Sequence, residues 1–101
     1  MQSRNMTKAD IVTIISSSTG LSKVETEAVV SGFMETVMDA MKRGETIELR
    51  GFGSFKVVKR AQRMARNPKT NQEVVVPEQY VPTLKMSKDF RKAVNEAMKG
   101  I

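Results

Sequence analysis

Apolar residues spaced three and four positions apart predict two helices in the first part of the chain. The first helix opens at Thr7–Asp10, which offers an N-cap hydroxyl and an acidic side chain in the first turn, and Gly20 is a natural left-handed stop. Its apolar side consists of Ile11, Val12, Ile14 and Ile15. The second helix begins with the capping box Ser22–Glu25 and runs to about Arg43, where Gly44 closes it.

The second helix carries a broad apolar face. Its members recur at three and four residues: Val30, Phe33 or Met34, Val37 or Met38, and Met41. The methionines of this face admit two interpretations, a stripe that binds varied partners or part of a packed core or subunit interface. We favour the core or interface, because methionine commonly fills irregular gaps between packed elements.

Alternation of apolar and polar residues predicts β-structure in the middle of the chain. We expect strands over residues 46–50, 54–58, 74–76 and 80–84. The turn Gly51–Gly53 is predicted to hold two glycines at positive φ around a buried Phe52. Pro77 interrupts the returning strand, which indicates an edge, a bulge or a bend. About residues 59–72 form a projecting hairpin arm without a continuous apolar face, so we expect it to be mobile until it binds a partner.

The chain ends in a short amphipathic helix capped by Ser87. Its apolar positions are Phe90, Ala93, Val94 and Ala97. Lys88, Arg91 and Lys92 lie near its start, where they form either a phosphate site or an ordinary solvated face. The pattern as a whole predicts an α+β fold with two N-terminal helices, a three-stranded antiparallel sheet extended by the arm, and a C-terminal helix.

The excess positive charge lies in one segment. The 101 residues include 17 Lys and Arg against 11 Asp and Glu, a net charge of +6. Residues 56–72 contain no acid and six cations, namely Lys56, Lys59, Arg60, Arg63, Arg66 and Lys69. The rest of the chain therefore balances, 17 − 6 = 11 cations against 11 acids. A bare cationic ribbon suits a polyanion; the alternative is a surface loop that its charges keep in solution.

Composition limits the classes of protein that the chain can represent. We expect one domain over residues 1–101 with residues 1–6 as a flexible extension, and a body so small and aromatic-poor favours an oligomer. The absence of Cys and His argues against disulfides, thiolate metal sites and the common catalytic groups, so we expect neither enzyme activity nor a cofactor. No apolar run matches a membrane span or a signal peptide, which predicts a cytoplasmic protein without a membrane partner.

Two motifs carry a resemblance to a known family. Gly51-Phe52-Gly53-x-Phe55, followed by Arg66-Asn67-Pro68-x-Thr70, resembles the bacterial histone-like HU and integration host factor family, from about Met6 to Asn95. Members of that family are themselves known minor-groove benders. The resemblance implies an intertwined dimer, homodimeric or paired with a paralogue, whose two arms surround double-stranded DNA in the nucleoid. It also implies that Pro68 intercalates between base pairs.

The resemblance further implies which residues contact DNA. On the arm they are Lys56, Lys59, Arg60, Arg63, Arg66, Asn67, Pro68 and Lys69, and on the body Lys8, Lys23, Ser87, Lys88 and Arg91. The chain departs from the common pattern at Ala65 and Asn71, where glycine is usual, and at Leu84, where phenylalanine is frequent.

The predicted function is an architectural protein that bends and compacts DNA largely without sequence preference. Three alternatives stay open on the sequence: a site-selective bender of the integration host factor type, an RNA-binding module that uses the same basic arm, and a protein-interaction module that uses the methionine-rich helix.

Overall fold

The computed structural model describes residues 4–100. Within this range the chain divides after Asp39 into two compact units, which we describe separately. Of the predicted extension over residues 1–6, residues 1–3 lie outside the described residues. Residues 4–6 are exposed and have no regular secondary structure.

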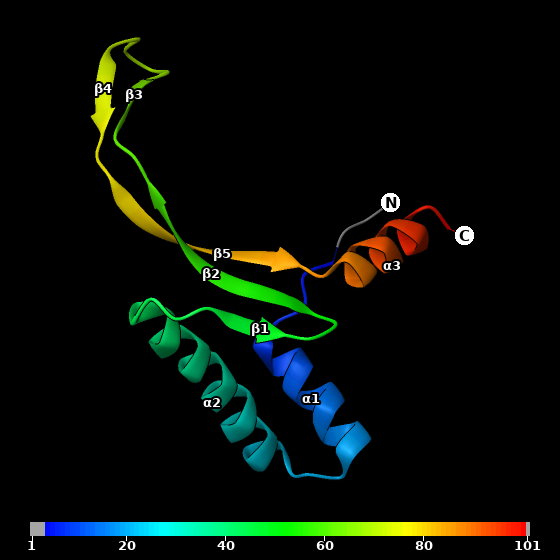
Figure 1. Cartoon of the computed structure of the whole chain (residues 1–101). Helices are drawn as coiled ribbons and strands as arrows, with labels where there is room; N and C mark the ends of the chain where they lie inside the picture. The colour runs from blue at the N-terminus through cyan, green and yellow to red at the C-terminus, as the bar shows by residue number, and fades with distance from the viewer. Residues whose placement is uncertain (1–3, 101) are drawn as a thin grey trace. The chain divides into compact units, whose positions relative to one another are not determined.

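The first unit holds helix α1 (Lys8–Thr19) and most of α2 (Lys23–Lys42), which Figure 1 shows in blue and cyan. Both predicted starts are confirmed. Thr7 caps α1 and closes a capping box with Asp10, and Gly20 ends α1 at φ 81°. At the start of α2, Ser22 N donates to a Glu25 carboxylate oxygen at 3.1 Å, and Glu25 N donates back to Ser22 Oγ at 3.1 Å.

The two capping boxes predict an acid-sensitive loss of helix stability. Hydrogen bonds from the Thr7 backbone N–H and hydroxyl lower the pKa of Asp10, and the Ser22 backbone and hydroxyl lower the pKa of Glu25. Because each pKa is lower in the folded protein, the contribution is complete above the free values of about 3.9 and 4.3. It disappears as pH falls below them through the folded-state pKa values.

We therefore expect the D10A/E25A double variant to be less stable than the wild type at pH 7, with the gap closing as the solution is acidified below pH ~3. Thermal unfolding followed by circular dichroism at fixed protein concentration checks this. A gap that is independent of pH would show that the carboxylates do not stabilise the helix starts through their charge.

The second unit contains two antiparallel sheets and a helix (Figure 1). Strands β1 (Ile47–Leu49), β2 (Gly53–Arg60) and β5 (Gln79–Met86) form a sheet in the order β1-β2-β5. Strands β3 (Arg63–Arg66) and β4 (Glu73–Val76) form a separate two-stranded sheet, and α3 (Lys88–Met98) follows β5. The predicted α+β fold with a hairpin arm is thus confirmed.

The turn between β1 and β2 differs from the prediction in two respects. Gly51 has a positive φ of 82°, but Gly53 does not. Gly53 is required for space, since a Cβ there would lie 2.5 Å from the backbone oxygen of Lys85 on β5. Phe52 is 40% exposed rather than buried, although its ring lies 5.6 Å from that of Phe90 and 6.3 Å from that of Phe55, between centroids.

A single chain buries very little apolar surface. Among the described residues only Val12 and Ala40 are buried apolar side chains, joined by the buried Thr26. Phe33, Met34 and Met38 on α2 are 45–52% exposed, so the predicted apolar face is not a core within one chain. Of the two packing roles weighed for it, only a subunit interface remains.

No helix within residues 4–100 is both long and apolar enough to cross a membrane.

Candidate nucleic-acid interface

The arm is one continuous ribbon whose hydrogen bonding is interrupted once. In the inner sheet Arg60 pairs with Gln79, and in the outer sheet Arg63 pairs with Val76. Two unpaired residues on each strand separate these pairs, 61–62 and 77–78, so the register continues without a bulge. We call these four residues, Ala61, Gln62, Pro77 and Glu78, the elbow. Pro77 has no N–H to donate, which is a physical reason for the interruption.

Alternation gives the inner sheet two chemically different faces. Phe55 and Val57 on β2 lie opposite Leu84 and Pro82 on β5 and form an apolar face. The other face is mainly polar, and its cross-strand pairs are Ser54 with Lys85, Lys56 with Thr83, Val58 with Val81, and Arg60 with Gln79. The predicted cations Lys56 and Arg60 therefore share one face of the sheet.

Lys59 lies on the opposite face from Lys56 and Arg60. Its Nζ is 3.5 Å from a carboxylate oxygen of Glu78 in the elbow. At the outer end of the arm, Arg66 Nη2 is also 3.5 Å from a carboxylate oxygen of Glu73. The basic segment thus has compensating acids, contrary to what its own composition indicated. They come from the returning strand, which the register brings alongside. Both pairs are more than half exposed and contribute little to stability.

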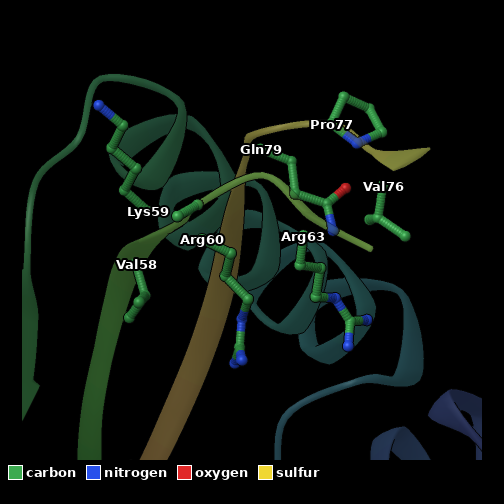
Figure 2. Close-up of a pocket in the computed structure, with 8 residues that line it drawn as sticks. Val58, Lys59, Arg60, Arg63, Val76, Pro77 and Gln79 are labelled. Carbon is green, nitrogen blue, oxygen red and sulfur yellow. The ribbon is translucent and has the colours of Figure 1, made fainter. Parts of the chain in front are cut away.

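The elbow contains a hollow of about 400 Å³ that is lined mainly by strand residues. Figure 2 shows the side chains of Arg60 and Arg63 pointing to the same side, with the Gln79 amide turned toward them, while Lys59 points away. Strict alternation would place Arg60 and Arg63 on opposite faces, since their positions differ by three, an odd number. The interrupted pairing turns the ribbon, so that the two arginines point to the same side.

The tip of the arm is a turn held by its own hydrogen bonds. Asn67 N donates to Gln72 O at 2.9 Å, Asn71 N donates to Asn67 O at 2.7 Å, and Lys69 N donates to Asn67 Oδ1 at 2.9 Å. Asn71 adopts the left-handed conformation at φ 60°, in agreement with its expected role in place of glycine. Pro68 is exposed and takes part in none of these bonds.

Arg66 supports this turn from β3. Its Nη1 donates to the backbone oxygen of Asn71 at 3.0 Å, in addition to its ion pair with Glu73. Arg66, which the sequence predicts to contact DNA, thus already braces the tip in the free protein. Pro68, Asn67 and Lys69 are presented at the far end of the cationic ribbon.

Ser87 caps α3 as predicted, and it also makes bonds that the sequence did not indicate. Its Oγ donates to Gly51 O at 3.0 Å and accepts from Phe90 N at 3.1 Å, and its backbone N donates to Phe52 O at 2.9 Å. These bonds tie the start of α3 to the β1–β2 turn. Since the hydroxyl proton is already used, Ser87 acts here as a clamp that positions the exposed Lys88 and Arg91.

An open hollow beside this clamp brings together cations from three parts of the second unit. It measures about 720 Å³, and Arg50, Lys85 and Lys88 are among its lining residues. Arg50 and Lys85 were not among the contacts predicted from the sequence. The alternation of apolar and polar residues along β5 was the signal that could have placed Lys85 on the polar face of the sheet. The predicted Lys8 and Lys23 are the exposed first residues of α1 and α2 in the first unit.

A cationic two-stranded arm extending an α+β sheet is typical of proteins that bind nucleic acid through a β-ribbon. The chain belongs to the family described as bacterial DNA-binding protein, whose sequence profile matches residues 6–95. This is a family of DNA-binding proteins and not of enzymes.

Individual relatives agree with this membership. The chain is 42% identical over 95 residues to integration host factor subunit beta of Marinobacter nauticus, covering 93% of this chain and 97% of the relative. It is 36% identical to DNA-binding protein HU 1 of Bacillus subtilis, with 88% and 97% covered. Among solved structures, the Anabaena HU–DNA cocrystal structure superposes with a TM-score of 0.82 at 35% identity, covering 88% of this chain and 97% of that one. The resemblance to the HU and integration host factor family is confirmed.

Proposed function

We propose that the protein is an architectural factor of the nucleoid that binds double-stranded DNA as a dimer and bends it. The two arms follow the minor groove, their cations neutralise phosphates, and Pro68 enters between base pairs at the end of each arm. Binding depends on charge and on the deformability of the duplex more than on base sequence. Lys8, Lys23, Lys88 and Arg91 contact the flanking DNA, with Ser87 holding the start of α3.

The observation that carries this proposal is the tip of the arm. An exposed, rigid proline stands in a turn that is complete without it, at the end of a cationic ribbon. Minor-groove architectural proteins insert such apolar wedges, and the few kcal/mol needed to unstack a base step are offset by the additional contacts of a bent duplex.

Energy transfer between dyes on the two ends of a short duplex tests the proposal directly. We expect the protein to shorten the end-to-end distance, and to bind nicked or kinked DNA more tightly than structured RNA of equal length. Tighter binding to the RNA, or an unbent duplex in a saturated complex, would contradict it. An unbent duplex would mean that the protein holds DNA by charge alone.

Salt dependence provides an independent measurement of the charged contacts. If a dimer neutralises on the order of eight phosphates, log K falls against log salt with a slope near −7, at about 0.9 per phosphate. Fluorescence anisotropy titrations over a range of salt concentrations give this slope. A slope shallower than about −2 would mean that the arms are not the main contact, and it would favour binding through the apolar helix face.

The exposed apolar surface supports the dimer. Phe33, Met34 and Met38 on α2, and Val94 and Met98 on α3, are 45–61% exposed in the single chain. A second copy that covers such faces supplies the burial that a body of this size lacks. Sedimentation at low micromolar concentration is expected to show a dimer, and a compact folded monomer there would exclude it.

A second candidate is a site-selective bender built from two different subunits. The observation that favours it is the higher identity to a protein named integration host factor subunit beta, 42%, than to HU 1, 36%. Selection from a random duplex library separates the candidates, because an enriched motif supports site selection and a flat outcome supports binding without preference. Mass measurement of the purified chain alone shows whether it dimerises without a paralogue.

A further inference from the structure

We infer that the elbow of each arm is a seat for one phosphodiester group of the DNA backbone, held jointly by Arg60, Arg63 and Gln79. The inference deepens the proposed function and rests on it. Where the proposal assigns the arm cations to phosphates in general, the geometry points to two arginines that share a single phosphate at a fixed place on the ribbon.

The interruption of strand pairing creates the seat. Arg60 lies directly opposite Gln79, so their side chains leave the same face of the inner sheet. Arg63 belongs to the outer sheet, and the turn of the ribbon at the elbow directs it to the same side (Figure 2). Three donor groups from two sheets thus line one hollow of about 400 Å³, whose lining also includes the half-buried Val58 and Val76.

The two arginines are free to accept a ligand. Among residues 4–100, neither Arg60 nor Arg63 makes an ion pair or a side-chain hydrogen bond. The neighbouring cations differ: Lys59 is turned away toward Glu78, and Arg66 is engaged by Glu73 and Asn71. From Lys59 to Arg66, therefore, the outer two cations have carboxylate partners and the arginine pair at the elbow has none within residues 4–100.

The chemistry of the donors selects a phosphate. Guanidinium groups present planar pairs of N–H donors that match phosphate oxygens, and the Gln79 amide adds a neutral donor. A phosphodiester offers two non-bridging oxygens, which two guanidinium groups can share.

The seat has a fixed separation from the wedge. Pro68 follows Arg63 by five positions, which at about 3.3 Å per residue gives at most roughly 16 Å. At 3.4 Å of helix axis per nucleotide of one strand, the seated phosphate lies within about five base pairs of the base step that Pro68 enters. The elbow thereby sets where Pro68 enters relative to the seated phosphate of the DNA backbone, and so where the duplex bends.

Methylphosphonate scanning of a nicked duplex tests the seat, with the nick fixing the position of the wedge. Each backbone position near the nick is replaced in turn by the uncharged analogue, and affinity is measured for the wild type, R60Q, R63Q and R60Q/R63Q. We expect one position on each side of the nick, within about five base pairs, at which the wild type loses on the order of tenfold in affinity. R60Q and R63Q are each expected to lose no further affinity when the uncharged analogue stands at that same position. The affinity loss of R60Q/R63Q is smaller than the sum of the two single losses, because both arginines share one contact.

K59Q is the matched control, since it removes a cation that lines the same hollow but points away from it. It is expected to bind more weakly overall while keeping the sensitive position. The seat is overturned if R60Q and R63Q become insensitive at different positions with additive losses, or if K59Q abolishes the sensitive position as they do. Failure of the proposed function is distinguishable, because the wild type would then leave the unmodified duplex unbent.

Discussion

Replacing Pro68 with Ala is expected to abolish most of the bend that the protein imposes on a short duplex, while weak binding to straight DNA survives. The variant loses the rigid ring and keeps every charge of the arm. The turn is expected to persist, because its hydrogen bonds join Asn67 to Gln72, Asn71 and Lys69 and do not involve Pro68. The preference for nicked over intact duplex should fall by roughly tenfold, because that preference reflects the cost of unstacking.

Lys69→Gln provides the matched control at the adjacent residue. Only the backbone N–H of Lys69 takes part in the turn, so the substitution removes a charge without disturbing it. We expect K69Q to bind every duplex more weakly and to bend each bound duplex as the wild type does. Energy transfer across the duplex at saturating protein separates the two effects. Equal bends for P68A and the wild type would reduce Pro68 to a turn former and remove the intercalation.

Replacing Gly53 with Ala is expected to produce the largest loss of stability from a single methyl group. The added Cβ would lie 2.5 Å from Lys85 O and 3.1 Å from Met86 Cα, and both are backbone atoms that cannot rotate away. Gly53 pairs with Leu49 on β1 and Met86 on β5, so the central strand would be forced away from a neighbour. Overpacking of this kind costs about 1–3 kcal/mol, and we expect a value at the upper end.

The neighbouring substitution Ser54→Ala serves as the control for G53A. Ser54 leaves the opposite face of β2, and its hydroxyl makes no hydrogen bond within residues 4–100. Its free energy of unfolding should stay within about 0.5 kcal/mol of the wild type. Urea unfolding at one fixed protein concentration compares all three, since the stability of a dimer depends on concentration. Equal midpoints for G53A and S54A would show that the strands separate at little cost.

The arm shows how much of the fold can be predicted from local sequence patterns. The loss of an apolar face after Lys59 and the turn at Pro68 were sufficient to predict a projecting hairpin. The predicted arm ended at about Gln72, however, and the outer hairpin also includes the returning strand Glu73–Val76. Pro77 was correctly associated with a break near the base of the arm, where the structure places the elbow.

In the folded chain the predicted contact residues lie on different faces and have different partners. Lys56 and Arg60 share the polar face of the sheet, whereas Lys59 lies on the other face beside Glu78. Ser87 was predicted to cap the last helix and to contact DNA, and its hydroxyl also bonds Gly51, 36 positions earlier in the chain. Such a bond leaves no periodic signal in the sequence, because it depends on how a turn and a helix start meet.

The sequence by itself determined the elements that depend on neighbouring residues alone. These are the capped helices, the alternating strands, the turn around Pro68 and the concentration of charge in one segment. Only the tertiary structure decided what each of those charges can do. Pairing across the ribbon gave Lys59 and Arg66 carboxylate partners from the returning strand, and the interrupted register at the elbow turned Arg60 and Arg63 to the same side. A charge binds a ligand only where its direction and its neighbours allow it, and both are set by residues distant in the sequence.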